Sequence, residues 1–118
     1  MSASVSWNLR VSIKEGQLDE FRSLMGEMVE STKAEAGAQG YEWFIGADGG
    51  SCHLNEKSAD SDAVMAHLGT FGARFADRFL GCVEPTSIHV YGEPSDEVRE
   101  ALDGFGAEYL GTFGGFSR

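Results

Sequence analysis

The feature that most constrains the fold is a strict alternation of apolar and polar side chains over residues 5–13, VSWNLRVSI. A period of two with β-branched residues predicts a strand with one buried face. The apolar face carries Val5, Trp7, Leu9, Val11 and Ile13. The polar face carries Ser6, Asn8, Arg10 and Ser12. Such a strand needs other elements packed over its apolar side.

A helical pattern follows the strand. After Gly16, apolar residues recur at helical spacing, which predicts a helix from about Gln17 to Glu35 with Gly37 as its stop. Residues 40–47 are rich in aromatics and predict a second strand. Asp48-Gly49-Gly50 then suits a tight hairpin turn into a third strand at residues 51–58.

The second half of the chain repeats the strand, helix, strand order. Asp60 or Ser61 suits the N-cap of a second helix, and Gly69 and Gly72 are expected to bend or split it near Thr70. Its apolar stripe contains Val64, His67, Leu68, Phe71 and Phe75. Pro85 is expected to introduce a last strand at residues 86–92, and Ser95 to cap a short final helix.

This order of elements predicts an α+β, ferredoxin-like βαββαβ fold. Four strands form an antiparallel sheet, and two helices cover one face. The opposite face is expected to carry large apolar groups as well, and a second subunit is the simplest cover for it. We expect one domain at residues 1–94, with the helix and glycine-aromatic tail of residues 95–118 packed on that domain or on a dimer partner.

The charge and composition of the sequence indicate which binding partners to expect. Nine Lys and Arg against 19 Asp and Glu give a net charge of −10, which disfavours nucleic acid and acidic membrane surfaces. The sequence has no long apolar run and no secretory signal pattern. Cys52 and Cys82 form no metal or disulfide motif. We therefore expect a cytoplasmic protein with two buried thiols.

Three pieces of the chain, within about residues 5–91, resemble the antibiotic biosynthesis monooxygenases. These are VSIKEGQLDEF, AEAGAQGYEWF and NEKSADSDAVMAHL. The positions that carry the resemblance are Lys14, Gly16, Glu35, Gly37, Tyr41, Glu42, Glu56 and His67. The sequence departs from the family at Ser58, where members often carry a pocket tryptophan, and at Ala36, where proline is common.

The resemblance implies a homodimeric α/β barrel with a hydrophobic pocket between the sheet and helices of each subunit. It also implies monooxygenation of an aromatic or quinol-like small molecule by O2, without metal or flavin cofactor. Two alternatives stay open. One is a haem-binding or haem-degrading relative with His67 as axial ligand, and the other is a non-enzymatic dimer that binds a small molecule.

Glu56 and His67 are the first candidates for catalysis. Glu56 shares a strand face with Cys52 and Leu54, and His67 lies in the helical stripe expected to face the sheet. A carboxylate that orients the imidazole would make His67 a base for a phenolic proton. The alternative is a hydrogen bond that only satisfies two buried polar groups, and the sequence favours this structural interpretation.

The remaining site candidates are weaker. Asn8 would donate a hydrogen bond to oxygen or to a substrate carbonyl if the polar face of its strand lined the pocket. Tyr41 and Trp43 suit a ring-binding wall, although aromatics in a strand are more often core. Val64, Leu68, Phe71 and Phe75 complete the expected pocket. No spacing of the three histidines indicates a metal site.

Overall fold

The computed structural model describes residues 3–118, so Met1 and Ser2, which begin the expected domain at residues 1–94, lie outside the described residues. The alternating segment forms β1 (Val5–Ile13), as predicted, and β1 is the central strand. It pairs antiparallel with β3 (Ser51–Ser58) on one side and with β4 (Val83–Gly92) on the other. Val5, Trp7 and Val11 are almost fully buried against the helices, as the alternation requires.

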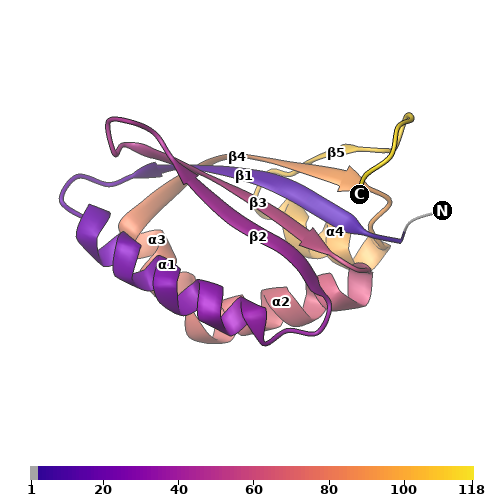
Figure 1. The fold of residues 1–118 in the computed structure, drawn as a ribbon, viewed down its shortest axis with the longest axis horizontal. Helices are drawn as coiled ribbons and strands as arrows, with labels where there is room; N and C mark the ends of the chain where they lie inside the picture. The colour runs from indigo at the N-terminus through magenta and orange to yellow at the C-terminus, as the bar shows by residue number, and fades with distance from the viewer. Residues whose placement is uncertain (1–2) are drawn as a thin grey trace.

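The sheet order is β2-β3-β1-β4-β5, and Figure 1 shows the helices gathered on one side of it. The first four strands are antiparallel, which confirms the ferredoxin-like arrangement. The prediction of only four strands is corrected by β5 (Glu108–Leu110), which pairs parallel with β4. A three-residue strand inside a glycine-rich tail has no alternation long enough to recognise in the sequence.

Two strand boundaries differ from the expected ones. β2 (Ala38–Ile45) ends before Gly46, because the Gly46 N–H donates to the carbonyl of Ser51 and starts the hairpin loop, in which Gly49 has a φ of +71°. β4 begins before Pro85 rather than after it. Pro85 fits inside the strand because the β1–β4 register shifts there, so its missing N–H falls at an irregularity.

The first two helices form where the sequence signals place them, but α1 ends at Lys33 rather than Glu35, and Ala34 rather than Gly37 is its C-cap. α1 (Leu18–Lys33) runs along the sheet with Phe21, Leu24 and Met28 buried. α2 (Ser61–Arg74) begins after Asp60, whose side chain accepts a hydrogen bond from the Ala63 N–H at 2.8 Å. α2 continues through Gly69 and Gly72 as far as Arg74, so the helix is not split near Thr70.

The chain breaks instead at Phe75 and continues as α3 (Ala76–Cys82), a helix that the sequence patterns did not indicate. Seven residues are too few for a clear helical period, so tertiary contacts define this element. Phe79 and Cys82 are buried beneath it. On the outside, Arg78 forms ion pairs with Glu20 and Glu27 of α1 at 3.1 and 2.9 Å.

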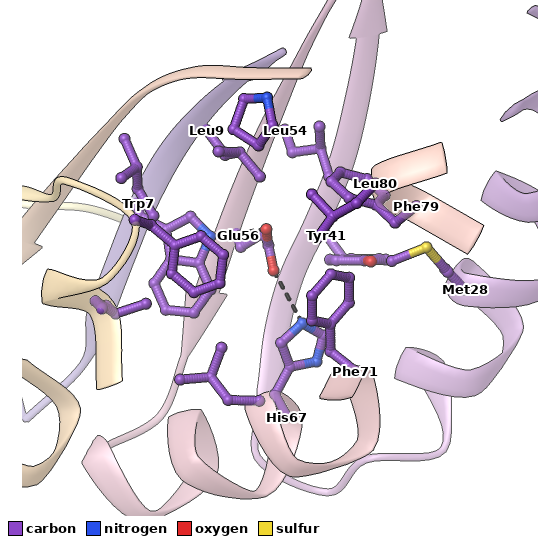
Figure 2. Close-up of a pocket in the computed structure, with 15 residues that line it drawn as sticks. Trp7, Leu9, Met28, Tyr41, Leu54, Glu56, His67, Phe71, Phe79 and Leu80 are labelled. Carbon is purple, nitrogen blue, oxygen red and sulfur yellow. Dashed lines mark hydrogen bonds and ion pairs between the residues drawn. The ribbon is translucent and has the colours of Figure 1, made fainter. Parts of the chain in front are cut away.

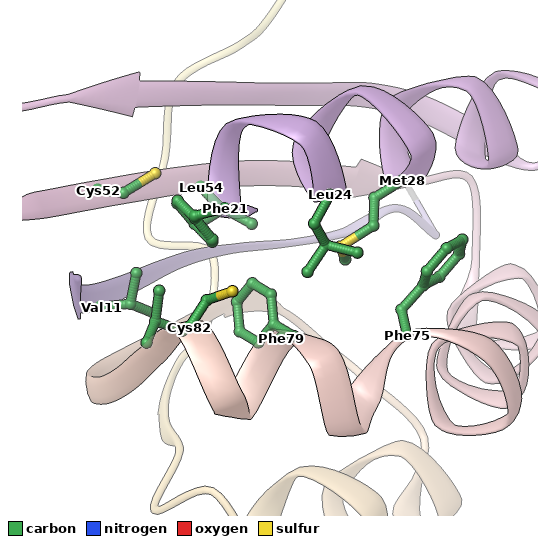
Figure 3. Close-up of a cluster of buried hydrophobic side chains, with 10 residues drawn as sticks. Val11, Phe21, Leu24, Met28, Cys52, Leu54, Phe75, Phe79 and Cys82 are labelled. Atoms are coloured by element: carbon green, nitrogen blue, oxygen red, sulfur yellow. The ribbon is translucent and has the colours of Figure 1, made fainter. Parts of the chain in front are cut away.

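The C-terminal helix α4 (Asp96–Asp103) begins as predicted, with the Ser95 hydroxyl accepting from the Val98 N–H. Two buried clusters fill the space between helices and sheet. The first lies under α1 and α3 (Figure 3) and contains Val11, Phe21, Leu24, Met28, Cys52, Leu54, Phe75, Phe79, Cys82 and Val83. The second lies under α2 and α4 and contains Val5, Trp7, Val64, Ile88, Val90, Val98 and Leu102.

The face of the sheet away from the helices is more polar than expected. Besides Phe44 and Tyr91, which are about half exposed, it presents mainly Ser6, Asn8, Arg10, Glu42, His53, Asn55, Lys57, Ser87 and His89. The expectation of large apolar groups on this face is therefore only partly met. Within residues 3–118, no helix combines the length and apolar character needed to cross a membrane.

Candidate functional site

A cavity of about 60 Å³ lies between the sheet and the helices, where the two buried clusters meet. Its wall is almost entirely apolar, apart from Glu56, His67 and the Tyr41 hydroxyl (Figure 2). Leu80 and Phe105, each more than 40% exposed, lie at its outer edge. The other lining residues are Trp7, Leu9, Met28, Leu54, Leu68, Phe71, Phe79, Pro85, Ile88 and Leu102.

His67 lies on the face of α2 that points to the sheet and contacts a carboxylate at each ring nitrogen. Nε2 is 3.0 Å from Glu56 Oε1, and Nδ1 is 2.9 Å from Glu35 Oε1. The side chains of His67, Glu56 and Glu35 are only 13%, 9% and 18% exposed. The imidazole is therefore held between two largely buried carboxylates from different elements.

The second oxygen of Glu56 is also occupied. Trp7 stands opposite Glu56 in the β1–β3 register, and its indole N–H donates to Glu56 Oε2 at 2.7 Å. A carboxylate buried this deeply needs hydrogen-bond donors to offset its lost hydration. Trp7 therefore fixes the orientation of Glu56 and directs Oε1 toward His67.

These contacts define how many protons the site holds. A neutral imidazole has a single N–H, so it can donate to only one of two carboxylates. Two N···O contacts of 3.0 and 2.9 Å therefore need one more proton, placed either on His67 or on a carboxyl group. The contacts thus indicate one proton beyond that of a neutral imidazole, shared among His67, Glu35 and Glu56.

Electrostatics favour the imidazole as the holder of that proton. Burial alone would lower the pKa of His67, but the hydrogen bonds and negative charges of Glu56 and Glu35 outweigh it and raise the pKa above its usual value. Tyr41 packs edge-on against the His67 ring, with ring centroids 5.5 Å apart. Burial, together with the charge of Glu56, raises the pKa of Tyr41 far above its usual value, so its phenol stays protonated.

The structure brings together some of the predicted site residues. Glu56, His67, Tyr41, Leu68 and Phe71 all line the cavity. The other aromatic and aliphatic candidates, Trp43, Val64 and Phe75, do not line it. Trp43 packs against Phe21 and Phe79, while Val64 and Phe75 are buried core residues.

Asn8 lies on the other face of the sheet, away from the cavity. Its side-chain amide donates to Asn55 at 2.7 Å and accepts from Arg10 at 3.0 Å. Alternation along β1 allows only one face to reach the cavity, and Trp7 and Leu9 occupy that face. Asn8 is therefore part of a polar cluster on the open side of the sheet.

Sequence reasoning missed two members of the site. The alternation places Trp7 on the apolar face of its strand but does not show that the β1–β3 pairing sets it opposite Glu56. Glu35 lies in a segment that resembles the family, and no local pattern connects it with a histidine 32 positions later. Both contacts depend on how separate elements meet in the folded chain.

Several solved structures are similar in fold to this chain. MupZ from Pseudomonas fluorescens superposes with a TM-score of 0.88 and 21% identity, and the match covers 99% of this chain and 96% of that one. SnoaB from Streptomyces nogalater, a cofactor-independent oxygenase, superposes with a TM-score of 0.68 and 16% identity, and the match covers 80% of this chain and 96% of that one. Rv0793 from Mycobacterium tuberculosis superposes with a TM-score of 0.68 and 22% identity, and the match covers 79% of this chain and 97% of that one.

These likenesses establish the fold, and the MupZ match extends it to the C-terminal region after β4. No curated protein matches the sequence significantly. The family model for antibiotic biosynthesis monooxygenases matches residues 5–74, from β1 to the end of α2, and so includes Trp7, Glu35, Glu56 and His67. Because this match spans more than half of the 118 residues, the chain belongs to the antibiotic biosynthesis monooxygenase family.

Proposed function

We propose that this protein is a cofactor-independent monooxygenase for a neutral aromatic or quinol-like small molecule. The observation that carries the proposal is the Glu56–His67 pair, held by hydrogen bonds in the wall of an otherwise apolar cavity. Membership of the family supports it, as does the shared fold of SnoaB, a cofactor-independent oxygenase. The pair supplies a base, and the apolar wall suits an aromatic ring.

In the proposed reaction, the Glu56–His67 pair removes a proton from a phenol or from an activated CH₂ group of the substrate. The electron-rich anion gives one electron to O2, and the resulting radical pair combines to a peroxide. The Glu56–His67 pair returns the proton to the peroxide, and loss of water then leaves a carbonyl where the CH₂ group stood. One oxygen atom thus enters the substrate and the other leaves as water, so no external reductant is needed.

Charge sets the kind of substrate that we expect. Two carboxylates and one imidazole that share one extra proton leave the site with a net charge of −1, and among residues 3–118 no Lys or Arg lines the cavity. An anionic substrate would be repelled in this weakly screened environment, whereas a neutral phenol or ketone would not. The substrate is therefore neutral when it binds and loses its proton only inside the cavity.

The cavity must widen before it can bind such a substrate. About 60 Å³ accommodates a few water molecules, whereas pockets for drug-sized ligands measure roughly 300–1,000 Å³. Leu80 and Phe105 are the exposed apolar side chains at its edge. In this proposal their side chains rotate outward and admit the ring of the substrate.

The haem alternative fits this geometry less well. An axial histidine needs a free ring nitrogen, and both nitrogens of His67 already contact carboxylates. Haem binding would have to break one of these contacts and leave a buried carboxylate without its partner. A titration with haemin tests this directly, because a sharp Soret band in the wild type that is lost in His67→Ala would favour haem.

Oxygen uptake with a panel of hydroquinones and anthrones tests the proposed reaction. We expect uptake with the wild type and a loss of the order of 10²-fold or more in Glu56→Gln and His67→Ala. Glu42→Gln, on the open face of the neighbouring strand, is the matched control and should retain full activity. Binding without turnover would identify a carrier, and equal turnover under nitrogen would identify acid–base chemistry without oxidation.

We also propose that the protein works as a homodimer that covers the open face of the sheet. Phe44 and Tyr91 on that face are half exposed, and the tail side chains of Phe113 and Phe116 are almost fully exposed in the single chain. The tail is tied to the same face where Lys57 Nζ donates to the Ser117 hydroxyl at 3.5 Å. A second copy packed there would remove these four aromatic side chains from water.

A further inference from the structure

The His67 ring separates two cavities. One is the cavity of about 60 Å³ described above, on the side of Glu56. The other measures about 10 Å³ and lies on the side of Glu35, beneath the C-terminal end of α1. Its wall consists of Met28, Ser31, Thr32, Glu35, Tyr41, His67, Thr70, Phe71 and Phe75. We call it the rear cavity.

The rear cavity differs from the first in chemistry as well as in size. It is lined by one carboxylate and three hydroxyl-bearing side chains from α1 and α2, Ser31, Thr32 and Thr70. A volume of about 10 Å³ is close to the minimum for one water molecule, which also needs polar partners. The rear cavity thus has the size and the polar groups for one water and is too small for a substrate.

Glu35 connects this cavity with the imidazole. Its Oε1 is 2.9 Å from His67 Nδ1, while its buried Oε2 has no hydrogen-bond partner among residues 3–118. A buried carboxylate oxygen without a donor is costly, and an ordered water is the usual remedy. The unpartnered oxygen and the water-sized space next to it point to the same occupant.

We propose that Glu35 is a positioning residue that carries protons between His67 Nδ1 and a water molecule in the rear cavity. This inference rests on the proposed function, because it assigns the route by which the imidazole gives up and regains a proton during turnover. The route lies on the opposite side of the imidazole from the substrate. Protons therefore leave and return to the imidazole while the first cavity is occupied by the substrate.

The transfers balance without any further reactant. Glu56 accepts the substrate proton, while the imidazolium of His67 keeps its Nε2 proton and releases its Nδ1 proton through Glu35 to the rear-cavity water. Glu56 later gives its proton to the peroxide formed from O2, and the water returns a proton through Glu35 to Nδ1. Each group then carries its original protons on the same atoms, so the site is ready for the next turnover.

The charged and titratable groups that face His67 come from three elements. Glu56 extends from β3, Tyr41 from β2, and Glu35 from the segment after α1. Arg74 of its own helix donates to the hydroxyl of Ser31, a residue in the wall of the rear cavity, at 3.2 Å. The two carboxylates are thus the negative charges nearest to the imidazole, and replacing Glu35 removes the one on the Nδ1 side.

Nuclear magnetic resonance of the His67 ring tests the inference without any substrate. In Glu35→Gln, which keeps the side-chain shape, we expect the pKa of His67 to fall and its Nδ1 proton to exchange severalfold more slowly with water. Glu30→Gln is the matched control, because Glu30 lies exposed on α1 and pairs only with Lys33. An unchanged pKa and exchange rate in Glu35→Gln would overturn the inference.

A second measurement separates this inference from the proposed function. Where the wild type turns over a substrate, Glu35→Gln should lower kcat by about tenfold or more, leave KM unchanged and displace the pH profile. A normal kcat in Glu35→Gln would overturn the relay even if the reaction itself is established. No turnover by the wild type would overturn the proposed reaction, and the proton exchange rate would still decide the role of Glu35.

Discussion

The indole N–H of Trp7 donates to Glu56 Oε2 at 2.7 Å, across a pair of directly opposed residues in β1 and β3. This contact joins the central strand to the candidate site. It leaves the other oxygen of Glu56 for His67. A residue that the alternation of β1 requires for packing therefore also orients the carboxylate in the cavity.

Trp7→Phe should destabilise the fold through this lost hydrogen bond. Removing the donor leaves a buried carboxylate oxygen unsatisfied, which costs about 1–3 kcal/mol in the free energy of unfolding. Trp43→Phe is the matched control, because it removes the same ring volume and an indole N–H that has no partner among the described residues. Urea denaturation should show the larger loss for Trp7→Phe, and equal losses would contradict the role given to this contact.

His67 should make the stability of the protein depend on pH. Its pKa in the folded protein is raised above the unfolded value of about 6.5, so its stabilising contribution is fully present below that value. The contribution is lost as the pH rises through the folded pKa. Urea denaturation between about pH 6 and pH 9 should therefore show stability that falls with pH in the wild type and a flatter profile in His67→Gln.

The control for the pH experiment is His53→Gln. His53 lies on the open face of β3, away from both carboxylates of the site. The stability of His53→Gln should depend on pH in the same way as that of the wild type. A wild-type profile that does not fall over this range would show that the two carboxylates do not stabilise the imidazolium.

Gly37→Ala should disturb the site from a distance. The added Cβ would collide with the Cβ of Ala63 on α2, because the turn before β2 passes directly over this helix. Overpacking of this kind costs about 1–3 kcal/mol and would shift α2, and with it His67, relative to Glu35. Thermal or urea unfolding measures the loss, and Ala63→Gly in the same chain should restore most of it.

The comparison variant for this position is Gly40→Ala. Its Cβ would meet Lys57 Cβ at 3.5 Å, which is ordinary contact. It should therefore cost much less than Gly37→Ala. A failure of Ala63→Gly to rescue Gly37→Ala would mean that the glycine acts through its backbone rather than through space.

Removing the tail aromatics should weaken association rather than folding. Phe113 and Phe116 are about 107% and 82% exposed in the single chain, so they contribute little to its own core. We expect Phe113→Ser/Phe116→Ser to raise the dissociation constant of the proposed dimer by about tenfold or more, since burying an aromatic side chain is worth about 1.5–3 kcal/mol. Analytical ultracentrifugation measures this constant. An unchanged dimer would place these side chains outside the interface.

Much of the fold follows from local patterns in the sequence. The alternation over Val5–Ile13 predicts a strand with a buried side, because side chains on a strand point to opposite faces in turn. Asp60 and Ser95 mark helix starts because their side chains accept the unpaired N–H groups of a first turn. The order of these elements was enough to indicate the ferredoxin-like arrangement.

The sequence by itself thus determined the elements, their buried faces and a short set of polar residues that fall on those faces, Glu56 and His67 among them. Only the tertiary structure decided which of these residues meet. Glu35 reaches His67 because α1 ends beside α2, and α3 and β5 exist because longer elements hold them in place. A local sequence pattern shows the periodicity of a single helix or strand. A site depends on the distances between several elements, and only the packing of the whole chain fixes those distances.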